Sequence, residues 1–185
     1  YQHKFDRGDI KSVLGQVEMT KHDAGVAWGS VHWQYLEDLA KVTPHEATPL
    51  NLAKEIYVRE NTKSGQVLKP IGSDLEPGDE LVVRLVLRTD RNMEFVHMND
   101  QRGSGTEPVN VLSGHRYQDG LAYYESTRDA SSHFFIDYLP KGTYVFEYPV
   151  KVFHRGRYQS GIANIQSMYA PEFNSHSASQ WLEVK

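Results

Sequence analysis

The chain has 185 residues, of which 39% are hydrophobic and 11% aromatic, and its formal net charge is −4. This hydrophobic content excludes an intrinsically disordered chain, and the lack of any basic block excludes the electrostatic footprint of a nucleic-acid-binding protein. Because the sequence contains no cysteine, disulfides, thiolate nucleophiles and cysteine metal sites are excluded together.

The first 47 residues predict two strands and a linker. Apolar and polar residues alternate over residues 8–21 and 26–36, and the second run carries aromatic residues of both parities. Pro44 and Pro49 then interrupt regular structure, because proline lacks a backbone donor and biases its predecessor to extended geometry. We therefore place a domain boundary near residue 47. Since the chain opens on tyrosine rather than methionine, we expect a piece of a larger protein.

From residue 48 onward, short apolar runs separated by turn residues predict an all-β domain. Strands are expected over residues 53–60, 66–70, 80–88, 93–98, 120–125, 132–138, 143–154, 157–169 and 179–184. In the clearest of them the odd-numbered positions from Leu81 to Leu87 are apolar, whereas Arg84 and Arg88 have the opposite parity. We predict an antiparallel β-sandwich, and a barrel remains the alternative that periodicity leaves open.

A polar stretch over residues 99–117 predicts one long loop, and loops of this length are often functional. Pro149 lies inside the strand expected over 143–154, which indicates an edge position or a bulge. The run from Leu139 to Tyr144 has the layout of a tyrosine corner, in which a turn with Gly142 leads into a strand. We expect Tyr144 to be buried, with its hydroxyl bonded to the backbone near residues 138–141.

Nine histidines invite a metal hypothesis, but no His-x-His or His-Glu-x-x-His spacing occurs. His133 and Asp137 share one strand parity, with Phe135 between them. We expect isolated surface histidines, with no metal and no cofactor.

Other catalytic signatures are missing as well. The serines in Gly103-Ser104-Gly105 and Ser113-Gly114-His115 lack the strand-to-helix context of a serine nucleophile. No acidic pair shows the signature spacing of a glycoside hydrolase; the carboxylates considered are Asp119, Glu125, Asp129 and Asp137. The chain is therefore expected not to be an enzyme.

A series of short motifs follows in order along the second segment. They are Pro-Gly-Asp-Glu at 77–80, Glu-Pro-Val-Asn at 107–110, Tyr-Gln-Asp-Gly-Leu-Ala-Tyr-Tyr at 117–124, Arg-Asp-Ala-Ser at 128–131, Phe-Phe-Ile-Asp-Tyr-Leu-Pro-Lys-Gly-Thr-Tyr at 134–144 and Gln-Ser-Met-Tyr-Ala-Pro-Glu-Phe at 166–173. Together these motifs resemble the final macroglobulin-like domain of bacterial alpha-2-macroglobulins. The resemblance covers roughly residues 48–185.

The resemblance implies a domain arrangement. Residues 48–185 would be the C-terminal macroglobulin-like sandwich, and residues 1–47, with Trp-Gly-Ser-Val-His-Trp-Gln-Tyr at 28–35, look like the second half of a CUB-like domain. The partners implied are the thioester and CUB-like domains of the same polypeptide, and target proteases through the parent protein. Neither nucleic acid nor membrane contact is expected of this segment. The parent is expected in the periplasm or at the cell envelope, where a lipid anchor could hold it.

The family also implies a role for two residues. Its members trap proteases, and in many of them a Cys–Gln thioester captures the attacking protease. Met168-Tyr169 matches the position of a tyrosine that shields the thioester in thioester-bearing members. In a parent without a thioester, Tyr169 would serve only a domain interface or the core.

A carbohydrate-binding or adhesion module of a secreted protein is the alternative, since the same architecture serves both functions. Such a module would need a clustered, exposed platform of aromatic rings. The aromatic residues of the later strands are too numerous for all to be core; they include Tyr123, Tyr124, Phe134, Phe135, Phe146 and Tyr148.

Overall fold

The structure is a computed structural model that describes residues 3–185, and this part of the chain divides into two units. The first unit ends at Leu36 and the second begins at Glu37. Within the described part of the first unit, the one regular element is the short 3₁₀ helix η1 (Ser12–Gly15).

The strands predicted over residues 8–21 and 26–36 are wrong for the described chain. Most apolar side chains of these segments are exposed, and Trp28 has an exposed fraction of 94%. A strand satisfies its backbone N–H and C=O groups through a neighbouring strand, and no described strand pairs with this segment. Alternation of apolar residues thus leads to a strand only where a partner is present.

The second unit opens with a connecting segment that is hydrogen-bonded to the strands after it. The segment contains the 3₁₀ helix η2 (Leu39–Lys41). His45 forms an antiparallel bridge with His176, and the Thr48 hydroxyl donates to the Asn174 carbonyl oxygen at 2.8 Å. The boundary between the two units therefore lies between Leu36 and Glu37. We had expected it further along the chain, near residue 47.

All the strands of the described chain lie in the second unit. They are β1 (Leu50–Thr62), β2 (Gly65–Pro70), β3 (Glu80–Thr89), β4 (Met93–Gln101), β5 (Thr106–Pro108), β6 (Gly114–Gln118), β7 (Leu121–Thr127), β8 (Ser131–Leu139), β9 (Gly142–Val152), β10 (Gly156–Gln159), β11 (Ala163–Ser167), β12 (Asn174–His176) and β13 (Trp181–Val184).

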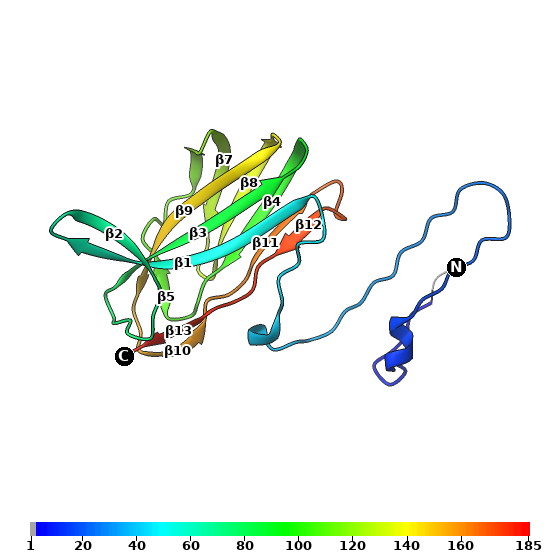
Figure 1. Cartoon of the computed structure of the whole chain (residues 1–185), viewed down its shortest axis with the longest axis horizontal. Helices are drawn as coiled ribbons and strands as arrows, with labels where there is room; N and C mark the ends of the chain where they lie inside the picture. The colour runs from blue at the N-terminus through cyan, green and yellow to red at the C-terminus, as the bar shows by residue number, and fades with distance from the viewer. Residues whose placement is uncertain (1–2) are drawn as a thin grey trace. The chain divides into compact units, whose positions relative to one another are not determined.

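Two antiparallel sheets form a sandwich in this unit (Figure 1). One has the order β2-β1-β3-β9-β5 and the other the order β12-β11-β4-β8-β7-β6, while β10 and β13 form a separate short pair. The buried side chains of both sheets meet in one core, where the rings of Phe134 on β8 and Phe146 on β9 lie 5.8 Å apart. Because neither sheet closes on itself, the fold is the predicted sandwich rather than a barrel.

The register predicted for β3 is confirmed. Leu81, Val83, Leu85 and Leu87 are buried in the core. On the opposite face Arg84 is half-buried beside Glu147, and Arg88 is exposed. The period-two pattern therefore predicted correctly which face of the strand meets the other sheet.

Two other predictions need correction. The strand expected over 157–169 is interrupted between β10 and β11, where Gly161 has a φ of +77°. The loop expected over 99–117 contains the end of β4 and the short strands β5 and β6. Pro149 lies just outside the part of β9 that pairs with β5, Val150–Val152, although its carbonyl oxygen still accepts the Val109 N–H at 3.3 Å.

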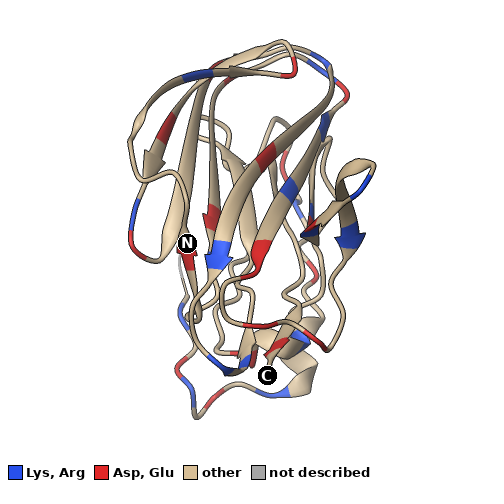
Figure 2. Cartoon of the chain, turned by 90° about the vertical axis from the view of Figure 1, so that its left-hand side faces the viewer, with Lys and Arg blue, Asp and Glu red and all other residues tan. Residues whose placement is uncertain are grey.

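Charged residues are spread over both sheets, with Lys and Arg interspersed among Asp and Glu along the strands (Figure 2). Several form cross-strand pairs, among them Lys69–Glu60 on β2 and β1 and Arg157–Glu183 on β10 and β13. None of the described helices has both the length and the apolar character needed to cross a membrane.

Candidate functional site

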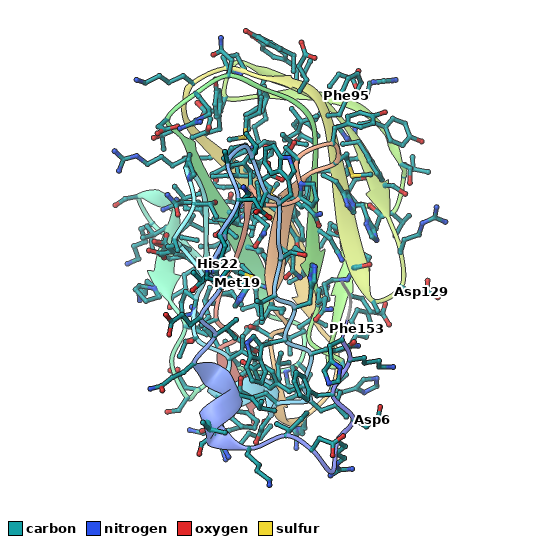
Figure 3. All side chains as sticks on the ribbon, turned by 90° about the vertical axis from the view of Figure 1, so that its right-hand side faces the viewer. Asp6, Met19, His22, Phe95, Asp129 and Phe153 are labelled. Atoms are coloured by element: carbon teal, nitrogen blue, oxygen red, sulfur yellow. The ribbon has the colours of Figure 1, made fainter. Side chains whose placement is uncertain are left out.

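Three exposed apolar side chains gather where β4 and the turn after β11 meet. They are Phe95, Met168 and Tyr169, with exposed fractions of 47%, 56% and 82%, and we call them the apolar tip. Figure 3 labels Phe95 at one end of the strands. An exposed cluster of this kind is a candidate contact surface, because large apolar groups are normally removed from water.

A short closed turn presents Tyr169. After β11 ends at Ser167, the Phe173 N–H donates to the Ala170 carbonyl oxygen at 2.9 Å, and the Ser167 N–H donates to the Phe173 carbonyl oxygen at 3.0 Å. Pro171 lies within this turn, where regular pairing has stopped. The chain therefore returns at once into β12, and the side chains at the start of the turn are left outside the core.

Phe95 joins the tip through two contacts with this turn. The Met168 N–H donates to the Phe95 carbonyl oxygen at 2.9 Å. The rings of Phe95 and Tyr169 pack edge to face, with centroids 5.3 Å apart and planes at 86°. This is a favoured geometry for two aromatic rings. Phe95 was not predicted from the sequence as a site residue, although the buried Met93 and Val96 lie three residues apart, a spacing that breaks period-two alternation.

The hydrogen bond of the predicted tyrosine corner is present, whereas the burial of its ring is only partial. The Tyr144 hydroxyl donates to the Pro140 carbonyl oxygen at 3.1 Å, within the backbone range that we expected. The prediction of a buried ring needs correction, since Tyr144 is half-buried. Desolvation raises the pKa of Tyr144, with smaller contributions from Asp119 and Tyr138. A Cβ at Gly142 would lie 3.3 Å from the Tyr144 hydroxyl oxygen, so glycine leaves room for the corner.

We expect Tyr144→Phe to lower the free energy of unfolding by about 1 kcal/mol, because the Pro140 carbonyl loses its partner. Denaturant unfolding followed by circular dichroism would measure the change. Tyr117→Phe, at an exposed tyrosine on β6, is the control and should leave the midpoint unchanged. Equal midpoints for the two variants would remove the structural role of the corner.

A buried ion pair that was not predicted from the sequence connects the two sheets. Lys54 on β1 donates to Asp100 on β4 at 2.6 Å, and their side chains are only 2% and 0% exposed. The Lys54 ammonium also donates to the carbonyl oxygens of Gln101 at 2.9 Å and Ser160 at 3.1 Å, while Tyr148 donates its hydroxyl hydrogen to Asp100. Burial lowers the pKa of Lys54 and raises the pKa of Asp100, and the attraction between the two groups opposes both shifts.

His97 and His133 of the six-stranded sheet stack on each other. His97 and His133 are joined by a hydrogen bond of 3.0 Å between Nε2 and Nδ1, and the ring of Phe135 stacks on His97 at 4.7 Å. His133 thus pairs with His97, and Asp137 is exposed. No group of three or more metal-ligating side chains occurs among residues 3–185.

Three of the other candidate groups have structural partners. Glu125 is bound by Arg116 at 3.1 Å, and the Asp119 carboxylate accepts the Val145 N–H at 2.7 Å. The Ser113 hydroxyl accepts the Thr127 N–H at 3.1 Å. These contacts account for the residues through the fold alone.

The aromatic residues divide between core and surface. Tyr123, Phe134, Phe146 and Tyr148 are buried. Tyr124 and Phe135 are exposed and lie opposite each other on β7 and β8, in a row that continues to His115 on β6 and His97 on β4. This row is the arrangement that a carbohydrate-binding alternative would require.

The chain matches a family model and solved structures of bacterial alpha-2-macroglobulins. Residues 50–172 match the family model described as the bacterial alpha-2-macroglobulin MG10 domain. No curated protein sequence matches the chain.

Among solved structures, native alpha-2-macroglobulin from Escherichia coli, spanning domain MG7 to the C-terminus, is 16% identical with a TM-score of 0.62. The match covers 79% of this chain and 25% of that one. A point mutant of Salmonella alpha-2-macroglobulin is 20% identical with a TM-score of 0.60, over 78% of this chain and 10% of that one. Trypsin-activated E. coli alpha-2-macroglobulin is 16% identical with a TM-score of 0.60, over 78% and 11%. At these identities the likeness concerns the fold, and the chain spans a quarter or less of the proteins that it matches.

Proposed function

The chain belongs to the bacterial alpha-2-macroglobulin MG10 domain family, and we propose that it is a non-catalytic domain of a protease-trapping inhibitor whose Tyr169 shields the thioester of a neighbouring domain. In this proposal the domain packs against the thioester domain of the same polypeptide. The target proteases are met by the parent protein as a whole. Its location would be the periplasm or the cell envelope, where a lipid anchor could hold it.

The observation that carries the proposal is the exposure of Tyr169 on a closed turn. A thioester is lost to water and to small amines, so a latent thioester needs a cover that excludes both. The tyrosine ring excludes water, and its hydroxyl can make one directed hydrogen bond. Met168 beside it adds apolar surface that a partner domain would cover.

The N-terminal segment also supports a place for this chain within a larger polypeptide. We propose that residues 1–47 are the second half of a CUB-like domain and that residues 48–185 are the macroglobulin-like domain. The exposed apolar residues before Leu36 would then be covered by strands elsewhere in the polypeptide, which would also supply the missing backbone partners.

We expect Tyr169→Ala in the full-length protein to increase the rate of thiol release by methylamine about tenfold, because removing the ring admits the amine to the thioester. The free thiol is measured with a chromogenic disulfide reagent over time. The fold should persist, since the Tyr169 side chain is 82% exposed in this domain.

Tyr117→Ala is the matched control, since it removes another exposed tyrosine, on β6, and should leave the rate unaltered. If Tyr169→Ala and Tyr117→Ala release thiol at the wild-type rate, the shield does not exist. A wild-type protein that releases no thiol at all would also contradict the shield and leave Tyr169 with an interface role only.

The carbohydrate-binding alternative rests on the row of rings formed by His115, Tyr124, Phe135 and His97. This row lies within residues 50–172, the region that matches the macroglobulin family. Because these rings pack against one another or against His133 and are not wholly exposed, we favour the inhibitor domain.

A further inference from the structure

We infer that Phe95 is a positioning residue for Tyr169, and that its strained backbone and its ring hold the tyrosine in the orientation in which it covers its partner. The contact between the two residues lies within this chain and does not depend on the proposed function. The effect on the thioester rests on the proposed function of Tyr169 as a shield.

The first observation is the backbone of Phe95, which has a φ of +52°. Only one other described non-glycine residue, Asp119, has a positive φ. Asp119 precedes Gly120 in the tight turn between β6 and β7, where aspartate followed by glycine is favoured. Phe95 lies inside β4, and a bulky residue in this conformation is a genuine outlier. Strain of this kind collects at functional sites.

The second observation is what the strained conformation achieves. Buried Met93 and buried Val96 lie on either side of two consecutive exposed residues, Glu94 and Phe95. In a regular strand, successive side chains point to opposite faces, so one of these two would enter the core. The left-handed residue lets the strand keep both core contacts while neither Glu94 nor Phe95 enters the core.

The third observation is that Phe95 contacts the Tyr169 turn through both its backbone and its side chain. Its carbonyl oxygen accepts the Met168 N–H at 2.9 Å, and its ring meets Tyr169 edge to face at 5.3 Å. A tyrosine with 82% exposure has few other restraints on its side-chain torsions. Phe95 therefore pre-organises Tyr169 before any partner is bound, and binding then costs less ordering of that side chain.

The decisive substitution is Phe95→Gly, because glycine accepts the positive φ without strain while the ring is removed. The fold should therefore persist, and any effect would come from the loss of the ring. Phe153→Ala is the matched control. Phe153 is 48% exposed, against 47% for Phe95, and lies well away from Phe95 in Figure 3.

The first measurement uses the 185-residue chain with ¹³C-labelled tyrosine rings. In Phe95→Gly the Tyr169 ring signals should move towards those of a free tyrosine, because the ring current of Phe95 and the restraint on rotation are both lost. In Phe153→Ala they should not move. Unchanged Tyr169 signals in Phe95→Gly would overturn the inference whether or not a thioester exists.

The second measurement is the methylamine reaction of the full-length protein. Phe95→Gly should increase the rate of thiol release by about two- to tenfold, the range that loss of one aromatic pair would produce. The double variant Phe95→Gly/Tyr169→Ala should react no faster than Tyr169→Ala, because Phe95 acts through Tyr169.

The outcomes separate the two proposals. If Tyr169→Ala speeds thiol release and Phe95→Gly does not, the shield stands and the positioning role is wrong. If the double variant reacts faster than Tyr169→Ala by the full factor of Phe95→Gly, Phe95 acts independently and the inference is also wrong. If neither single variant changes the rate but the Tyr169 signals move in Phe95→Gly, the shield fails while Phe95 still positions Tyr169.

Discussion

Replacing Lys54 with Met is expected to lower the free energy of unfolding by about 3–5 kcal/mol, the usual cost of removing one partner of a buried ion pair. The reason is that Asp100 would keep its carboxylate in the core without a cation. The carbonyl oxygens of Gln101 and Ser160 would also lose the ammonium that now donates to them. Because β1 and β4 belong to different sheets, the loss weakens the contact between the two layers. Denaturant unfolding at pH 7 measures the change.

The matched control is Lys69→Met, which breaks the exposed pair between Lys69 and Glu60 and should cost less than about 1 kcal/mol. The double variant Lys54→Met/Asp100→Leu should recover part of the loss, since it removes the stranded carboxylate. Its remaining deficit would report the unpaired carbonyl groups and the Tyr148 hydroxyl. A cost for Lys54→Met no larger than for Lys69→Met would contradict the structural role of the buried pair.

In Lys54→Met, the free energy of unfolding should also depend on pH, and the sign of this dependence can be predicted. Burial raises the pKa of Asp100, and Lys54 is the largest influence opposing that shift, so Lys54→Met should raise this pKa further. A carboxyl group with a raised pKa binds its proton more tightly in the folded state than in the unfolded state. The folded variant is therefore favoured below the ordinary carboxyl pKa of 3.8 and loses stability as pH rises through the raised value. Unfolding measured at several pH values above 4 would show this decline.

The second large effect is expected for Gly161→Ala, which should lower the free energy of unfolding by at least about 3 kcal/mol. Gly161 has a φ of +77°, and a Cβ built there would lie 2.5 Å from the Gln101 carbonyl oxygen. That oxygen belongs to β4 and accepts a hydrogen bond from Lys54, so it cannot withdraw without disturbing the ion pair. Both the left-handed backbone and the close approach therefore require glycine.

Gly120→Ala is a closely matched control for this substitution. Gly120 has a φ of +78°, and nothing lies within 4 Å of a Cβ placed there. Its replacement should cost only the backbone penalty, about 1 kcal/mol. The difference between the two variants, measured by thermal or denaturant unfolding, isolates the close contact between Gly161 and β4. If both variants lose the same stability, this contact contributes nothing.

Much of the sandwich could be predicted from local patterns. The alternation in β3 correctly predicted that Leu81, Val83, Leu85 and Leu87 face the core, because a side-chain period of two follows from strand geometry alone. The hydrogen bond between Tyr144 and Pro140 lies within four residues of chain, so its signal is local. Met168 and Tyr169 could be singled out from motif order, and their place after a strand that ends near Pro171 is also a local property.

The buried ion pair shows where local patterns stop. Lys54 has the parity of the buried Leu52 and Ile56, and Asp100 has the parity of the buried Val96 and Met98. The sequence therefore indicates two charged residues of opposite sign on inward faces. Which charge pairs with which depends on how two sheets stack, and the sequence pattern of one strand carries no information about the other sheet.

By itself, then, the sequence determined the class of fold and the core-facing side of β3, because these follow from spacing along the chain. Only the tertiary structure decided that Phe95 meets Tyr169, that Lys54 meets Asp100 and that residues 3–36 form no strand. The physical reason is the same in all three cases. Each depends on whether a second segment, distant in sequence, supplies a ring, a charge or a backbone partner at the right place.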